Sequence, residues 1–328
     1  MMFLTKCHNM KTTSSSLTFM IARVFLFITV FVFSSLPASA ATARQKGFST
    51  PDDAALALVK AIESKNRKEV EAIFGPEAKI LTSSGDPIED KADAERFLKA
   101  FKEAYTIRPR SPEVAILHIG SQDFPFPIPL VKDGNTWFFD TKAGREEIVN
   151  RRIGRNELGA MDVLRAYVDA QREYYEMKLG ANGAREYARK IMSAKGKKDG
   201  LYWEVKEGEQ ESPFGPLVAS ASEEGYTAGK KKGMVPYNGY FYRPLAGQGS
   251  HAAGGAKQYI VNDGMTGGFA LVARPAKYGS SGIMTFIVNQ DGTIYEKDLG
   301  KHTDRLVKEM KLFDPDETWR PVREMSKN

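Results

Sequence analysis

Histidines are the first residues to consider for acid–base chemistry, and the chain has four of them. His118 alternates with apolar neighbours in a strand-like run, and His302 precedes a helical stretch. His251 lies beside Ser250 in a glycine-rich loop. The fourth histidine, His8, lies in the amino-terminal segment that we expect to be removed. Among the remaining three, no HExxH motif or histidine–cysteine pair occurs, so the sequence predicts no metal site. His251 is the only plausible catalytic base, but it has no partner at a recognisable spacing, so we assign no catalytic residue.

Two glycine-rich segments resemble catalytic or phosphate-binding loops only superficially. Gly247-Gln248-Gly249 and the later Gly254-Gly255 lack the Lys-Ser/Thr pair and the following helix of a phosphate-binding loop. Gly279-Ser280-Ser281-Gly282 does not have the Gly-x-Ser-x-Gly spacing of a nucleophile elbow. We therefore expect a flexible crossing between strands at 247–255, a turn at 279–282 and no cofactor.

Aromatic residues give the clearest indication of ligand binding. Four of them lie within residues 237–242, and Trp203 lies in an earlier strand-like run. In a strand, Tyr240 and Tyr242 share one face and Phe241 points to the other. One face could then pack on a helix while the other stacks on sugar or peptide. The alternative is that these residues simply form the core of a sheet, where tyrosine is common. The predicted ligand-binding residues are Trp203, Tyr237, Tyr240, Tyr242 and His251.

The first 40 residues have the pattern of a secretory signal peptide. A mostly apolar run of ten residues, Val24 to Phe33, precedes the small-residue pattern Ala38-Ser39-Ala40. A membrane span needs about 20 apolar residues, so an uncleaved anchor is the weaker alternative. We predict cleavage between Ala40 and Ala41, a periplasmic or secreted protein, and no transmembrane segment after cleavage. Translation could begin at Met1, Met10 or Met20.

Charge and cysteine content exclude several classes of function. The chain has 47 Lys and Arg against 41 Asp and Glu, and three of the positive residues precede residue 40, which leaves 44 − 41 = +3. So small a surplus argues against a nucleic-acid partner. The single cysteine, Cys7, lies in the predicted signal peptide, which excludes disulfides, cysteine catalysis and zinc ribbons in the mature protein. Two lysine runs, at 195–198 and 230–232, have two interpretations: they are solvated charges of surface loops, or they form a cationic patch that binds an anionic polymer.

The predicted first domain, residues 41–143, has helices followed by strands. Thr50-Pro51 is a strong helix start, and further helices are predicted at 68–74 and 90–105. Strands are predicted at 114–119, 128–132 and 136–140, with a hairpin turn at 133–135. This order, and the opening helical pair AALALVKAIESKNRKEVEAIFGP, resemble the cone-shaped fold of nuclear transport factor two. The resemblance implies helices on a curved antiparallel sheet and leaves the function open.

The predicted second domain, residues 144–328, combines one long helix with a glycine-rich antiparallel meander, so the fold class is α+β. Helical spacing extends from Ala143 to about Leu179, and a break is expected at Gly154 or Gly159, each weaker than Ala by about 1 kcal/mol. Strands are predicted at 201–205, 239–244, 268–273, 283–289 and 293–297, and a final helix at 303–313. The stretches NELGAMDVLRAYVDAQ and GFALVARPAKYGSSGIMTFIVNQDG resemble the spine helix and sheet of pilin or pseudopilin heads. Unlike in pilins, a whole domain precedes this helix.

Six short sequence segments are distributed along the mature chain: FPIPLV, WFFDT, RIGRNEL, SPFGPL, PYNGYFY and MTGGFA. With these, the chain is similar to an uncharacterised family of exported bacterial proteins, domain of unknown function twenty-nine fifty. The resemblance implies no activity.

Three functions are compatible with the sequence. The first is a non-enzymatic binding or assembly factor of the envelope, whose partner is a cell-envelope polymer or an envelope protein. The second is a secreted hydrolase or isomerase with an acid–base pair inside the cone, His118 with Asp123 or Asp140, which requires these side chains to point inward. The third is a pseudopilin-like component of a secretion or surface system, which should cross-link to secretion machinery.

Overall fold

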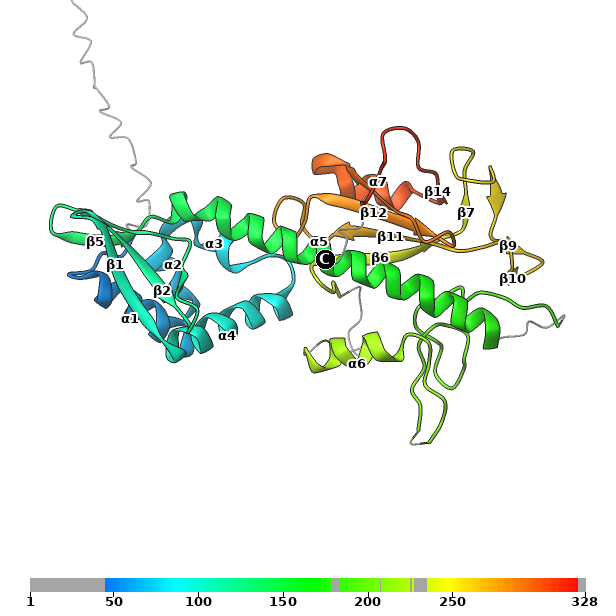
Figure 1. The fold of residues 1–328 in the computed structure, drawn as a ribbon, viewed down its shortest axis with the longest axis horizontal. Coiled ribbons are helices and arrows are strands. Elements are labelled where there is room, and N and C mark those ends of the chain that lie inside the picture. The colour runs from blue at the N-terminus through cyan, green and yellow to red at the C-terminus, as the bar shows by residue number, and fades with distance from the viewer. Residues whose placement is uncertain (1–44, 178–182, 207, 225, 227–234, 324–328) are drawn as a thin grey trace, which may run out of the picture. The chain divides into compact units, whose positions relative to one another are not determined.

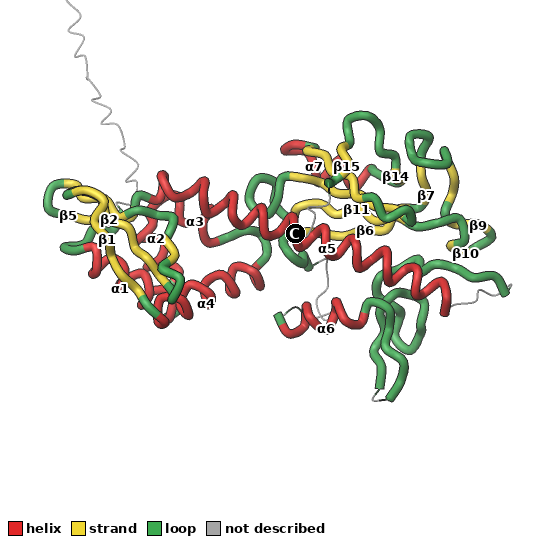
Figure 2. The backbone as a smooth tube through the Cα atoms, in the orientation of Figure 1, coloured by secondary structure: helices red, strands yellow, loops and turns green. Residues whose placement is uncertain are grey.

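The computed structural model describes residues 45–177, 183–206, 208–224, 226 and 235–323. The predicted signal peptide and the lysine run at 230–232 lie outside these residues. Helices and several antiparallel sheets make up the described fold, so the predicted α+β class is confirmed (Figures 1 and 2). None of the helices in the described ranges is long and apolar enough to cross a membrane.

Helices open the described chain, and polar caps set where they start. They are α1 (Pro51–Glu63), α2 (Arg67–Phe74), the 3-10 helix η1 (Gly75–Glu77), α3 (Ala78–Thr82) and α4 (Pro87–Glu103). Side-chain oxygens of Thr50, Asn66 and Asp86 accept N–H groups from the first turns of α1, α2 and α4. The helix predicted at 90–105 starts three residues earlier, at Pro87, because Asp86 caps it.

The first sheet follows these helices and packs against them. Its strands are β1 (Tyr105–Ser111), β2 (Val114–Ile119), β3 (Phe124–Pro125), β4 (Leu130–Asp133) and β5 (Thr136–Phe139). The order is β1-β2-β4-β5, and β3 pairs with β2. Along β2, Ala115, Leu117 and Ile119 are buried, whereas the residues between them are half-buried. The predicted hairpin joins β4 and β5, with Asp133 paired to Thr136.

Helix α5 (Thr141–Met177) is continuous, so the predicted break at Gly154 or Gly159 is wrong (Figure 1). Gly159 serves close packing instead, because a Cβ there would lie 2.7 Å from Cγ of Asn238. Several polar side chains of α5 bind the backbone of neighbouring segments, and two of them lie near the middle of the helix. The guanidinium of Arg152, which is 3% exposed, donates to the carbonyls of residues 80 and 81. Glu157 Oε1 accepts the N–H groups of residues 283 and 284, at 2.9 and 3.0 Å.

The second sheet supplies most of the core on which α5 packs. It contains β6 (Tyr240–Leu245), β11 (Ala270–Pro275), β12 (Met284–Asn289), β13 (Ile294–Asp298) and β15 (Arg320–Pro321) in the order β15-β13-β12-β11-β6. Leu164 and Val168 of α5 share one buried cluster with Leu271 and Ile287. Helix α7 (Thr303–Glu309) contacts β11 as well, and Figure 1 shows it across the sheet from α5. Every residue of β11 is therefore buried.

Smaller elements complete the described chain and correct two predictions. They are α6 (Gly215–Glu223), β7 (Gly247–Gln248), β8 (Lys257–Gln258), β9 (Ile260–Val261), β10 (Gly264–Met265), the 3-10 helix η2 (Gly300–His302) and β14 (Leu312–Phe313). The strand predicted at 201–205 is absent, because only Tyr202 pairs there, in an isolated bridge with Met192. The last helix ends at Glu309 rather than Phe313, because Met310 is extended and Phe313 pairs in β14 with β7.

Candidate ligand-binding cavities

Tyr240 is part of the core and not of an exposed aromatic face. Its side chain is fully buried, and its hydroxyl donates to the carbonyl oxygen of Met284 at 2.9 Å. Burial, followed by the negative charge of Glu157, raises the pKa of this hydroxyl. The sequence predicted that Tyr240 and Tyr242 share one exposed strand face for ligand stacking. At Tyr240 this face is covered by protein, so a ligand cannot stack on its ring.

Tyr237 and Tyr242 are half-buried and contact each other. The hydroxyl of Tyr242 donates to the carbonyl of Tyr237 at 3.2 Å. The ring of Tyr237 meets that of Tyr226 edge-to-face, with 4.9 Å between centroids. Burial, helped by Glu224, raises the pKa of Tyr237 to about 12. These tyrosines form a packed corner, which favours the alternative that they are core residues, and a ligand contact at either of them stays a prediction.

Trp203 combines burial with an unsatisfied polar atom. The residue is 7% exposed, and Lys198 Nζ lies 5.2 Å from the centroid of its ring. Its indole Nε1 is buried and has no hydrogen-bond partner among the described residues. A buried donor without an acceptor costs about 1–3 kcal/mol. Trp203 also lines a cavity, so the residue combines an aromatic surface for a ligand with a buried polar atom that has no protein partner in the described chain.

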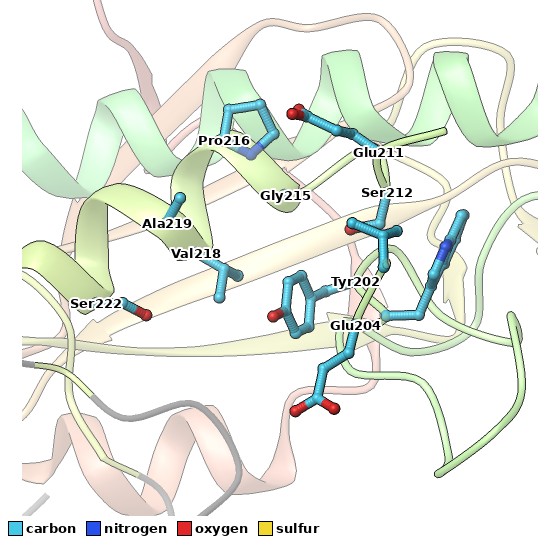
Figure 3. A pocket seen from close by; sticks show the side chains of 11 residues that line it. Tyr202, Glu204, Glu211, Ser212, Gly215, Pro216, Val218, Ala219 and Ser222 are labelled. Carbon is cyan, nitrogen blue, oxygen red and sulfur yellow. The ribbon is translucent and has the colours of Figure 1, made fainter. Parts of the chain in front are cut away.

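A cavity of about 520 Å³, which we call the Trp203 cavity, separates residues 202–205 from α6 (Figure 3). Tyr202 and Trp203 provide its aromatic wall, and Glu204 and Glu211 provide carboxylates. The ring of Tyr202 lies between Glu211 and Glu204 in Figure 3 and faces Val218. Among the described residues, neither carboxylate forms an ion pair. Both therefore stay available as hydrogen-bond acceptors.

A second cavity, of about 540 Å³, lies between α1, α2 and α4, and we call it the helical cavity. Its lining is mostly apolar and includes Phe74, Phe97 and Phe126. Asp90 also lines it, and both carboxylate oxygens accept the N–H of Ser84, at 2.9 and 3.2 Å. Burial raises the pKa of Asp90, although the hydrogen bonds to Ser84 oppose this. The two cavities share no lining residue.

The histidine of the predicted cone pair lies on the wrong face of its sheet. His118 Nδ1 is 3.3 Å from Asp123 Oδ2, so this pair forms. Along β2, however, His118 alternates with the buried residues Leu117 and Ile119, so it points away from the core that these residues enter. Asp123 is also bound by Arg108 at 2.6 Å. Asp140 instead accepts the N–H of Ala143 at 3.0 Å, near the start of α5.

His251 has a partner that sequence spacing could not reveal. Its ring Nδ1 lies 3.1 Å from Asp314 Oδ1, which also accepts the backbone N–H of His251 at 2.8 Å. Gly249 makes this approach feasible, because a Cβ there would lie 2.1 Å from Cγ of Asp314. The buried amide of Gln248 donates to the carbonyls of residues 253 and 255 and so holds the loop.

Comparison with known proteins gives a family and no activity. No curated protein and no solved structure matches the chain. The resemblances to the nuclear transport factor two cone and to pilin heads therefore stay predictions. One family model, described as protein of unknown function (DUF2950), matches residues 45–322. Because this match covers most of the 328 residues, the chain belongs to the DUF2950 family of proteins of unknown function.

Proposed function

We propose that this protein is exported to the cell envelope and binds an envelope glycan there without changing it chemically. The Trp203 cavity is the proposed site. The observation that carries the proposal is the composition of this cavity, in which two aromatic side chains lie beside two carboxylates that are free of ion pairs within the described residues.

Sugars have the chemistry that this cavity offers to bind. The C–H face of a pyranose stacks on aromatic rings such as that of Tyr202, which is half-buried. Sugar hydroxyls donate to carboxylates such as Glu204 and Glu211, and hydrogen bonds to charged groups contribute about 1.5–3 kcal/mol each. A hydroxyl oxygen that reached Nε1 of Trp203 would also satisfy a buried donor.

Glycan binding can be tested with chitotetraose, a neutral oligosaccharide, followed by tryptophan fluorescence. We expect Tyr202→Ala and Glu211→Gln each to weaken binding about ten-fold, which is ~1.4 kcal/mol. Glu173→Gln is the matched control, because Glu173 is exposed on α5 outside the cavity. Trp203→Phe should remove the fluorescence change. If oligolysine binds and chitotetraose does not, the glycan assignment is wrong and the site takes cationic peptides.

Export is supported by the apolar run Val24 to Phe33 and by Ala38-Ser39-Ala40. The test is expression of the full chain, followed by fractionation and amino-terminal sequencing of the protein. We expect the exported protein to begin at Ala41. Recovery of the full-length chain in the membrane fraction would contradict cleavage.

A second candidate function is hydrolysis with His251 as the base. It is favoured by the contact between Nδ1 and Asp314, because a carboxylate at one ring nitrogen orients the imidazole for proton transfer at the other. The same chitotetraose samples distinguish the two functions. If the protein only binds glycan, mass spectrometry should show intact oligosaccharide after prolonged incubation. If the oligosaccharide is cleaved, and His251→Ala abolishes the cleavage, the protein is a hydrolase and the proposal of binding without chemical change is wrong.

A further inference from the structure

The helical cavity has an apolar interior that the glycan proposal does not use. Phe97 and Phe126 meet with 5.3 Å between ring centroids, and Ile62, Val70 and Leu98 add aliphatic surface. Its volume of about 540 Å³ is in the range of small-molecule sites, which are mostly apolar with few polar groups. Binding a hydrocarbon ligand here removes apolar surface of both ligand and protein from water, which favours such a ligand.

The acidic side chains around this cavity are already neutralised or hydrogen-bonded. Asp90 accepts backbone N–H, as described above. The others form ion pairs, namely Glu63 with Lys102 (2.7 Å), Asp93 with Arg96 and Arg155 (both 2.7 Å), and Glu95 with Lys91 (3.4 Å). Of the cations at the cavity, Arg67 is paired with Glu71 at 3.1 Å.

Lys65 is different, because its ammonium group forms no ion pair with any described residue. The residue is exposed and lies between α1 and α2 with a left-handed backbone, φ 54°. Its N–H donates to the carbonyl of Ile62 at 3.0 Å, which fixes this turn at the edge of the cavity. A free cation beside an apolar cavity is complementary to an amphiphile with an anionic head group.

We propose that the helical cavity binds a long-chain fatty acid, with the hydrocarbon chain among the phenylalanines and the carboxylate at Lys65. The site is separate from the Trp203 cavity and does not depend on the glycan proposal. Tyr202→Ala should therefore leave fatty-acid binding unchanged.

The test uses cis-parinaric acid, a fluorescent fatty acid, with hexadecanoate and hexadecanol as competitors. Hexadecanoate should displace the probe at a lower concentration than hexadecanol, because only the former has a charge for Lys65. Lys65→Met should weaken binding about three-fold, as expected for one exposed ion pair. Lys99→Met is the matched control, because Lys99 is exposed on α4, outside the cavity and without an ion pair in the described chain.

A cavity-filling variant tests the location of the chain. Ala94 lines the cavity, and Ala94→Trp should weaken binding about ten-fold or more by occupying the space. Circular dichroism must show a folded protein, and if it does not, Leu98→Gln, which places an amide on the apolar wall, replaces this variant. Unchanged affinity in the folded variant would overturn the proposal. Equal displacement by hexadecanol, or binding only to phosphatidylglycerol vesicles, would also overturn it.

Discussion

Asp86 and Tyr226, which are 140 residues apart in the sequence, share a buried hydrogen bond of 2.7 Å. The same oxygen, Oδ2, accepts the N–H of Gly239 at 3.2 Å. The other oxygen accepts the N–H groups of residues 88 and 89 at the start of α4. One carboxylate, fully buried, thus joins three segments that are distant in sequence.

Asp86→Ala should destabilise the fold strongly. The substitution removes a helix cap and leaves the Tyr226 hydroxyl and the Gly239 N–H buried without an acceptor, at about 3–5 kcal/mol in total. Asp86→Asn retains an acceptor for the cap and should cost less. Urea unfolding measures both, and a loss below about 1 kcal/mol for Asp86→Ala would contradict a structural role of this carboxylate.

Leu164→Ala should cost about 2–5 kcal/mol, as a large-to-small change in a core does. Leu164 is fully buried where α5 packs on the second sheet. Leu158→Ala on the same helix is the control, because Leu158 is 50% exposed. Thermal melts should separate the two variants, and coincident melts would show that α5 does not pack on this sheet.

Tyr242→Ala should reduce stability and leave chitotetraose binding unchanged. The reason is that the Tyr242 hydroxyl binds the backbone of Tyr237, and its ring packs against the core of the second sheet. Tyr202→Ala should show the opposite pattern. If Tyr242→Ala lost glycan affinity without a change in melting temperature, Tyr242 would be a ligand contact, as the sequence predicted.

Asp90 should make stability depend on pH in a defined direction. Burial raises its pKa in the folded protein from the usual 3.8, so folding favours the protonated carboxyl. This contribution is complete below pH 3.8 and is lost as the pH rises through the folded pKa. The side chain of Asp90→Asn does not titrate, so its stability does not follow this loss. As the pH rises from 3.8 through the folded pKa of Asp90, the variant should therefore become more stable relative to the wild type. Urea unfolding between pH 3.5 and 7 checks this, and a difference that shrinks as the pH rises would reverse the sign.

Local signals in the sequence predicted much of the first part of the fold. Thr50-Pro51 marked the start of α1, and alternation predicted β2 with the residues that the structure shows, Val114 to Ile119. The predicted break at Gly154 or Gly159 was wrong. Helix propensity treats a glycine only as a weak helix former, whereas Gly159 allows the close approach of Asn238 in the folded protein. Strand β1 was missed, since most of its residues are exposed and show no alternation.

The candidate sites were less accessible to sequence reasoning, because they depend on contacts between distant segments. Asp314 is 63 residues from His251, and no spacing rule connects them. The Trp203 cavity needs α6, whose Ser-Pro-Phe-Gly-Pro start is typical of a turn. Tyr240 is covered partly by Gly282, where a Cβ would lie 2.1 Å from the tyrosine oxygen.

The continuity of α5 limits how its length can change. Arg152 binds the end of α3, and Glu157, five positions later, binds the start of β12. An inserted residue between them would turn the two side chains by about 100° relative to each other, because a helix has 3.6 residues per turn. Seven inserted residues, about two turns, would restore the direction but add about 10 Å between the two anchors. The segment from Arg152 to Glu157 therefore tolerates substitutions on its exposed side but no insertion or deletion.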